Sequence, residues 1–339
     1  MRLGVLDQSP VRKDGSTAEA IAETITLAKR CEALGYHRYW LAEHHNTTSF
    51  AGSSPEIMIA RVAAETSIIR VGAGGVMLTH YSPLKVAENF RVLETLYPGR
   101  IDLGVGRAPG ADQRTSIALQ AGPQAWSIEA FPQQVELLRA FLEDATGAAV
   151  FGADHPYRGI HASPRGPGVP EIWLLGSGVH SAIYAAEMGL GFSFAHFITS
   201  EGGPDVAQVY RERFKTSGGF AAPQLSVGVF VLCAETEKEA RRLAATRNLW
   251  VLQLFSGRGG AFPSPEEALA YPYSEAERAQ IRAIEARGIV GTAAQCKARL
   301  EKLAADYGAD EIIVLTITYD FAARIRSYEL LAKAFALKP

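Results

Sequence analysis

Strand-like and helix-like segments alternate along almost all of this 339-residue chain. Short apolar runs that end in turn or ionisable residues indicate strands, and most are followed by segments with apolar residues at helical spacing. Such alternation requires parallel strands covered by helices, and eight units in one chain predict a closed (β/α)8 TIM barrel. The alternative, an open doubly wound sheet, lacks its Gly-x-Gly-x-x-Gly cue after the first strand. The predicted strands are 3–7, 38–42, 69–78, 101–105, 172–175, 191–195, 225–232 and 311–315.

Two stretches interrupt this alternation. Residues 146–170 are rich in Gly, Pro and His and follow a predicted helix at about 133–142, whereas residues 256–288 follow the seventh strand and its helix. The first part of the second stretch, 256–274, is predicted to be irregular, and a long irregular loop in a compact domain often closes over a site. We interpret both stretches as insertions into one barrel domain that spans residues 1–339.

The overall charge and the cysteine pattern exclude several classes of protein. With 34 Lys and Arg against 36 Asp and Glu, the net charge of −2 creates no field that would attract nucleic acid or an acidic membrane surface. No apolar run approaches the roughly 20 residues of a membrane span, and Asp7 precedes any signal-peptide core. The three cysteines have neither disulfide nor metal spacing, which is typical of a reducing compartment. We therefore expect a cytoplasmic protein that binds neither nucleic acid nor membranes.

If the barrel forms, one rim collects polar side chains from several strand ends, which is how barrel enzymes assemble their sites. The acid and imidazole groups among them could bind a metal ion, serve as structural hydrogen-bonding groups, or contact an organic ligand. Two observations disfavour a metal site. The first strand carries only Asp7 and lacks the His-x-His pair that is typical of metal-dependent barrel hydrolases. In addition, Zn²⁺ prefers a compact tetrahedral set of ligands. We favour the organic ligand and predict no metal site. The rim residues are Asp7, Glu43, His44, His45, His80, Arg107, Ser177 and His196.

Glycines mark two further places in the sequence. The pair Gly74-Gly75 lies within the third strand, where it either forms a simple bulge or lets a ligand approach the backbone. The run Gly176-Ser177-Gly178 leads into a helix, whose free amides and positive dipole end attract anions. Arg107 follows the fourth strand and is either a surface ion-pair partner or a bidentate partner for phosphate. These residues predict a barrel enzyme or binding protein whose ligand carries a phosphate.

Six segments of the sequence form a specific set of motifs. They are residues 40–45 (Trp-Leu-Ala-Glu-His-His), 71–78 (Val-Gly-Ala-Gly-Gly-Val-Met-Leu), the helix from Pro83, 99–107 (Gly-Arg-Ile-Asp-Leu-Gly-Val-Gly-Arg) with its continuation to Thr115, 173–177 (Trp-Leu-Leu-Gly-Ser) and 310–312 (Asp-Glu-Ile). Taken together, these segments resemble the bacterial luciferase-like flavin monooxygenases, and most closely their YhbW-like members. The likeness is strong over residues 3–122 and moderate over 172–200 and 289–330.

The resemblance implies a barrel that binds reduced FMN or, in one branch, a reduced deazaflavin, and that usually activates dioxygen. Glu43 and His44 match positions near the flavin ring, and the matching His is catalytic in luciferases. The pair Gly74-Gly75 matches a non-prolyl cis peptide bond beneath the flavin ring. At the turn that binds the phosphate, the alignment fits a phosphate contact from either His180 or Ser181. The cofactor-binding residues implied are Gly74, Gly75, Met77, Arg107, Gly176, Ser177, Gly178 and Ser181.

The leading hypothesis is an FMN-dependent monooxygenase that receives reduced FMN from a separate NAD(P)H:flavin reductase and uses dioxygen on a small organic substrate. His44 would serve as an acid–base or hydrogen-bonding group, and Glu43 would orient the ring or the imidazole. The resemblance also implies a homodimer. The alternatives are a reduced-deazaflavin-dependent oxidoreductase, a flavin-binding protein without turnover, and a metal-dependent barrel hydrolase.

Overall fold

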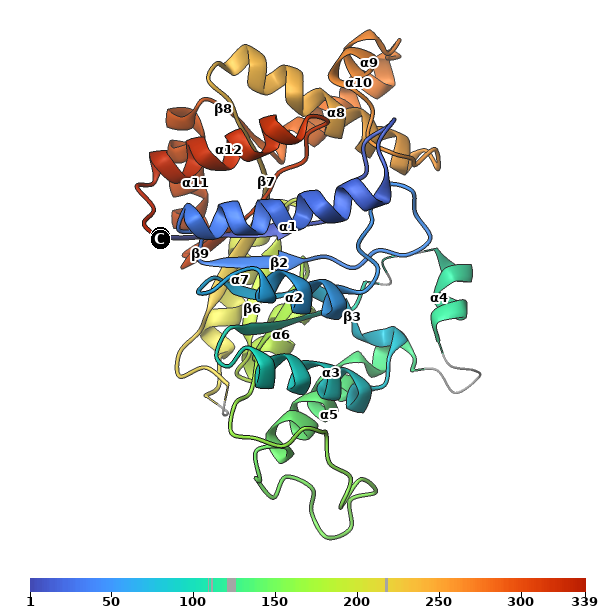
Figure 1. The fold of residues 1–339 in the computed structure, drawn as a ribbon, viewed down its shortest axis with the longest axis vertical. Coiled ribbons are helices and arrows are strands. Elements are labelled where there is room, and N and C mark those ends of the chain that lie inside the picture. Colours follow the sequence, from blue (N-terminus) through green and yellow to red (C-terminus); the bar gives the residue numbers. More distant parts are fainter. Residues whose placement is uncertain (109, 111, 121–125, 217–218) are drawn as a thin grey trace.

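The computed structural model describes residues 1–108, 110, 112–120, 126–216 and 219–339 and shows a closed barrel of parallel strands surrounded by helices (Figure 1). Each strand of the ring pairs with the next strand of the ring, and the last pairs with the first, so the ring closes. The predicted (β/α)8 barrel is therefore confirmed. Its strands, in pairing order, are β1 (Arg2–Asp7), β2 (Arg38–Leu41), β3 (Arg70–Met77), β4 (Ile101–Gly106), β5 (Glu171–Gly176), β6 (Gly191–Ala195), β7 (Leu225–Cys233) and β9 (Glu311–Leu315).

A short extra strand, β8 (Ile289–Gly291), lies outside the ring and was not predicted. The nine-residue strand β7 is longer than its neighbour in the barrel, so β9 pairs only with its residues 226–230. The remaining residues 231–233 pair with β8. Three residues are too few to produce an alternating pattern, which explains why this strand could not be recognised in the sequence.

Twelve α-helices are present among the described residues, and two short 3-10 turns, Leu78–His80 and Ile128–Ala130, follow β3 and precede α5. The helix predicted at about 133–142 and the helix from Pro83 are confirmed as α5 and α3. The first helix, α1, begins with reciprocal capping bonds between Ser16 and Glu19. The helices are α1 (Thr17–Ala33), α2 (Pro55–Ala64), α3 (Pro83–Leu96), α4 (Gln113–Leu119), α5 (Phe131–Asp144), α6 (Val179–Glu187), α7 (Gly203–Arg213), α8 (Glu237–Phe255), α9 (Pro265–Ala270), α10 (Glu275–Ala286), α11 (Ala293–Tyr307) and α12 (Phe321–Ala334).

The two insertions behave differently. Residues 146–170 contain no helix or strand and form the loop at the foot of Figure 1. The prediction that 256–274 is irregular is wrong in part, because α9 lies within it and α10 begins directly after it. Each of these helices starts with a capping box, at Ser264 and at Ser274, that satisfies its free amides. Phe262 anchors the preceding loop by packing, fully buried, against Trp250.

The interior of the barrel is built in layers because alternate residues of each strand point inward. At the amino ends of the strands, the charged side chains of Arg38, Asp102 and Glu311 fill the lowest layer and are at most 2% exposed. An apolar layer that includes Trp40 and Trp173 lies above them. The interior is therefore filled from the amino ends upward. In the part of the chain that the structure describes, no helix is long and apolar enough to cross a membrane.

Candidate active site

A cavity of about 530 Å³ lies at the carboxyl ends of the barrel strands, above the apolar layer. This volume is within the range of small-molecule and cofactor sites, about 300–1,000 Å³. All ten predicted site residues line it, although they come from four separate segments of the chain. They are Glu43, His44, Gly74, Gly75, Met77, Arg107, Gly176, Ser177, Gly178 and Ser181. Because the strands are ordered β2, β3, β4, β5, Glu43 and His44 lie on one side of the glycine pair. Arg107 and residues 176–181 lie on the other side.

Glu43 follows β2 and is held by three hydrogen bonds. One of its carboxylate oxygens accepts a bond from the Tyr81 hydroxyl at 2.7 Å and lies 2.7 Å from Nε2 of His45, while the other accepts from the backbone N–H of Met77 at 3.1 Å. The side chain is only 1% exposed. The carboxylate therefore ties the end of β2 to the end of β3, and both of its oxygens are occupied by protein groups.

His44 has a different environment from the two residues beside it. Its ring stacks on Phe50 at a centroid distance of 4.4 Å, and its Nδ1 is buried with no hydrogen-bond partner among the described residues. Burial, and then the neighbouring His45, lowers the pKa of His44 to about 4. The imidazole is therefore neutral at pH 7, and a buried ring nitrogen remains available for a ligand group in the cavity.

The floor beside these residues is built where β3 departs from regular pairing. The register of β3 against β4 shifts between Ala73 and Val76, and the peptide bond between Gly74 and Gly75 is cis. A Cβ at Gly74 would lie 2.9 Å from the Cβ of Trp40, and one at Gly75 would lie 2.7 Å from the carbonyl oxygen of Gly104. Only glycines fit at these two positions, so the backbone itself forms part of the cavity surface.

The opposite side of the cavity is rich in groups that bind anions. Strand pairing of Gly106 with Leu175 places Arg107 next to the turn that begins at Gly176. Gly178 is the N-cap residue of α6, so the free amides of the first helical turn face the same region. A Cβ at Gly176 would approach Oγ of Ser181 to 2.5 Å, so this glycine makes room for the serine hydroxyl. Ser181 lines the cavity and His180 does not.

Four residues of the predicted rim do not line this cavity. Asp7 turns outward, away from the cavity-lining Leu6, and is fully buried against Nη2 of Arg324 at 2.7 Å. His45 supports Glu43, and His196 contacts the Tyr307 hydroxyl through Nδ1 at 2.9 Å. His80 lines a separate cavity with Glu56 and Lys85. Within the described residues, no group of three or more His, Cys, Asp or Glu side chains is arranged to hold a metal ion.

Several contributors were missed by the reasoning from sequence. Tyr81 positions Glu43, and Phe50 stacks on His44, yet both lie in connecting segments that carry no recognisable motif. Trp40 was recognised only as part of a motif, although its ring forms the floor of the cavity. Alternation along β2 could have identified it, because Trp40 is two residues from the cavity-lining Ala42 and so faces the same side. Pro109, in the segment of the family resemblance that continues to Thr115, lies outside the described residues.

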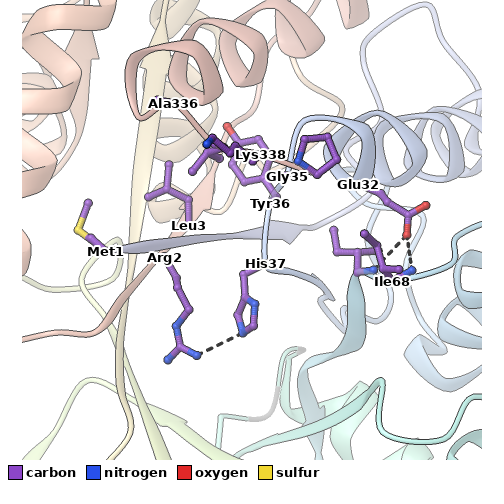
Figure 2. Close-up of a pocket in the computed structure, with 13 residues that line it drawn as sticks. Met1, Arg2, Leu3, Glu32, Gly35, Tyr36, His37, Ile68, Ala336 and Lys338 are labelled. Carbon is purple, nitrogen blue, oxygen red and sulfur yellow. Dashed lines mark hydrogen bonds between the residues drawn. The ribbon is translucent and has the colours of Figure 1, made fainter.

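A second cavity, of about 470 Å³, lies at the amino ends of the strands, where both chain termini meet (Figure 2). Several of its polar side chains are bonded within the protein. Arg2 lies against His37 at 3.4 Å, and Glu32 accepts hydrogen bonds from the backbone N–H groups of residues 67–69 at 2.7–3.0 Å. Because barrel enzymes carry their chemistry at the carboxyl ends, we assign the site to the first cavity.

The fold and this cavity together define a barrel enzyme of a known family. Residues 1–311 match the model of the luciferase-like monooxygenase family, and the chain therefore belongs to that family of oxidoreductases. One relative, the N-acetyl-S-alkylcysteine monooxygenase of Bacillus subtilis (strain 168), is 37% identical over 98% of each chain. A protein named luciferase-like monooxygenase from Escherichia coli (strain K12) is 36% identical over 96% of this chain and 94% of its own length.

Solved structures agree with this assignment. The crystal structure of apo-MsnO8 has a TM-score of 0.90 and 39% identity, and covers 100% of this chain and 99% of that one. Two more distant structures share the fold alone. One is the oxygenating constituent of 3,6-diketocamphane monooxygenase from Pseudomonas putida in complex with FMN, with a TM-score of 0.71, 19% identity and coverage of 98% and 97%. The other is an F420-dependent secondary alcohol dehydrogenase in complex with an F420-acetone adduct, with a TM-score of 0.70, 14% identity and coverage of 98% of each chain.

Proposed function

We propose that this protein is a monooxygenase that uses reduced FMN and dioxygen to oxidise a small organic substrate. The observation that carries the proposal is the convergence of all ten expected flavin-site residues on one cavity of about 530 Å³. Structures of the same fold have been solved with FMN and with an F420 adduct, so the choice between FMN and a deazaflavin belongs to the proposal.

The cavity offers suitable contacts for both ends of FMN. The guanidinium of Arg107, the hydroxyls of Ser177 and Ser181 and the N-terminus of α6 would hold the phosphate, because they combine positive charge with hydrogen-bond donors. The backbone at Gly74-Gly75 would lie against the ring. A Cβ added at Gly106 or Gly178 would meet no other atom within 4 Å, so both glycines leave open space beside the phosphate groups. When bound, reduced FMN supplies the electrons that activate dioxygen.

Two side chains of this protein would act beside the ring. The neutral imidazole of His44 would donate or accept one hydrogen bond at its buried Nδ1, and its lowered pKa keeps it uncharged at neutral pH. Glu43 would act as a positioning residue, because its oxygens already bind Met77, Tyr81 and His45. These contacts hold the ends of β2 and β3 at a constant separation.

The rest of the cavity would receive the substrate. Its remaining surface includes the apolar side chains of Ile128, Phe197 and Ile198, which suit a small molecule with an apolar part. One relative is named for oxidation of N-acetyl-S-alkylcysteines, so thioethers of this kind belong in the first substrate panel. Reduced FMN would come from a separate NAD(P)H:flavin reductase.

Titration of the purified protein with FMN, riboflavin and a deazaflavin of the F420 type tests the cofactor assignment. We expect FMN to bind at least tenfold more tightly than riboflavin, since only FMN carries the phosphate that Arg107 and α6 would hold. Oxygen uptake should then require NADH or NADPH, an added flavin reductase and a substrate from the panel. Tight binding of the deazaflavin without measurable affinity for FMN would overturn the FMN assignment in favour of the alternative oxidoreductase.

We also propose a homodimer that acts in the cytoplasm. Apolar side chains are exposed on α2, on α3 and in the segment that follows α2, namely Ile57 (66%), Ile68 (65%), Val92 (45%) and Leu96 (59%). Such a group suits a self-complementary interface. Light scattering should give twice the 36.5 kDa chain mass, and the double change Ile57→Glu and Val92→Glu should give the monomer. The three cysteines are free and buried, which agrees with a reducing compartment.

A further inference from the structure

A small pocket outside the barrel cavity contains a buried positive charge that no residue of the described chain neutralises. Arg247, on α8, is only 6% exposed, and its Nη1 is buried without a hydrogen-bond partner among the described residues. Its guanidinium lies 4.3 Å from the centre of the Phe230 ring. Burial, and then the charge of Arg287, lowers the pKa of Arg247 to about 10, so the side chain remains charged at neutral pH. An unpaired buried cation costs free energy, which a bound anion would offset.

The surroundings of Arg247 are predominantly basic. The pocket has a volume of about 70 Å³ and is lined by two further arginines, Arg241 on α8 and Arg299 on α11. Arg299 is anchored by donating from Nη2 to the carbonyl oxygen of Gly288 at 2.6 Å. The carboxylate that lines the pocket, Glu285, accepts a hydrogen bond from Asn248 at 3.3 Å. Arg241 is paired with Glu237, outside the pocket, at 2.6 Å. Two other guanidinium groups, those of Arg247 and Arg299, therefore share the pocket with the single lining carboxylate of Glu285.

The size of the pocket limits what can enter it. A water molecule needs roughly 10–15 Å³ of such space, so about 70 Å³ accommodates one tetrahedral or planar oxyanion and excludes a flavin. A wider groove of about 560 Å³ adjoins the pocket and shares Arg241, Asn248 and Glu285 with it. The groove is partly apolar, with Leu269, Tyr273 and Ile281 among its lining residues. The anion can thus arrive alone or as the head group of a larger molecule.

We propose that the pocket between α8, α10, β8 and α11 is a binding site for a small oxyanion, with Arg247 as its central ligand and Arg299 and Arg241 at its rim. It is separate from the flavin cavity, because the two share no lining residue. In Figure 1 these elements lie at the top of the molecule, apart from the loop of residues 146–170 at its foot.

Calorimetric titration with inorganic phosphate at constant ionic strength tests the site. We expect saturable binding in the millimolar range that falls at least tenfold in Arg247→Met and severalfold in Arg299→Gln, because each change removes a charge-assisted hydrogen bond. The matched control is Arg282→Gln on α10, an exposed arginine that does not line the pocket and should leave binding unchanged. Phenyl phosphate, with an apolar body that can enter the groove, should bind more tightly than phosphate if the natural ligand is a head group.

Phosphate can also occupy the proposed flavin-phosphate site, so every titration is repeated in Arg107→Ala. Binding that survives Arg107→Ala and disappears in Arg247→Met supports the pocket, whatever cofactor the barrel cavity takes. Binding that disappears in Arg107→Ala and persists in Arg247→Met overturns the proposal, as does the absence of saturable binding. Arg247→Met replaces a buried charge with an apolar chain, and its melting temperature without phosphate should equal or exceed the wild-type value. Should Arg247→Met fail to fold, the surface variant Arg299→Gln gives the decisive measurement, and unchanged phosphate binding in it contradicts the site.

Discussion

The two ends of the barrel interior differ in whether their polar and charged side chains are paired within the protein. At the amino ends of the strands, Arg38 lies 2.6 Å from Asp102 and 3.0 Å from Glu311, and Asp102 also binds Arg70 at 2.5 Å. At the carboxyl ends, the Nδ1 of His44 has no partner among the described residues, and the exposed Arg107 lies beside the cavity. One end thus satisfies its polar groups internally, whereas the other leaves an imidazole nitrogen and a guanidinium group available. This is the division between stability and chemistry expected of a barrel enzyme.

The largest expected effect is at the amino end. Asp102→Ala leaves the buried Arg38 and the partly exposed Arg70 without their shared partner and removes the acceptor of the Trp40 indole N–H, which lies at 2.8 Å. Breaking a buried ion pair on one side costs about 3–5 kcal/mol, and we expect urea denaturation to show a loss of that size. Glu171→Gln, at the half-buried edge of the same network, is the control and should cost less than about 1 kcal/mol. A similar loss of stability in Asp102→Ala and Glu171→Gln would show that burial does not determine how much each carboxylate contributes.

The opposite result is expected at the carboxyl end. Arg107→Ala should leave the urea midpoint unchanged, because the side chain is exposed. It should weaken the binding of FMN about ten- to a hundredfold, because it removes a charge-assisted contact. Riboflavin, which lacks the phosphate, should bind both forms equally. An equal loss for the two flavins would refute the phosphate role of Arg107.

Glu43 tests whether a buried charge at the cavity end behaves like one at the amino end. Glu43→Ala removes the acceptor for the Tyr81 hydroxyl and the Met77 N–H, but water in the cavity can reach these donors. We therefore expect a loss of about 1–3 kcal/mol, less than that of Asp102→Ala. Tyr81→Phe removes only one of the bonds to Glu43 and should cost about 1 kcal/mol or less. A loss in Glu43→Ala as large as that in Asp102→Ala would remove the contrast between the two ends.

The smallest effect concerns two histidines, one near each end. Burial first, and then nearby positive charge, lowers the pKa of both His37 and His44 to about 4. Below the unfolded value of about 6.5 the unfolded chain binds protons that the folded chain does not, so stability is complete above pH 6.5 and falls toward pH 4. Between pH 7 and pH 6 we expect a loss of less than about 1 kcal/mol from each. His44→Gln and His37→Gln should each flatten the denaturation profile in that window, and an unchanged profile would contradict the lowered pKa.

Flavin binding should separate these two histidines. FMN in the cavity should shift the NMR resonances of His44 and leave those of His37, which faces the cavity at the other end, in place. A shift of His37 alone would move the flavin site to the amino ends of the strands and contradict the assignment.

The sequence was sufficient for the barrel and for residues that carry a local signal. The capping box at Ser16 and the glycines at 74, 75 and 176 were recognisable because backbone geometry permits few alternatives there. The capping boxes at Ser264 and Ser274 were equally visible, and they could have identified α9 and α10. Ser54 and Ser82 also precede helices, but neither side chain makes a capping bond.

What could not be predicted depends on direction and on tertiary contact. Asp7 is the last residue of β1, and His196 directly follows β6. Neither lines the cavity, because each side chain points to another face. The role of Tyr81 depends on the contact between the ends of β2 and β3, which no local pattern encodes. Helix α7 begins after the left-handed Gly202 and has few apolar residues, so its periodicity is weak.

The indole of Trp40 belongs to both ends of the barrel at once, since its ring forms the cavity floor and its N–H is bonded to Asp102. A change of this residue would alter the ligand surface and the paired charges beneath it together. New substrate ranges in this lineage must therefore arise mainly by replacement of residues around the mouth, such as Ile128 and Ile198. In laboratory evolution for a new substrate, we expect accepted substitutions to accumulate at the mouth while Trp40 and Asp102 remain unchanged.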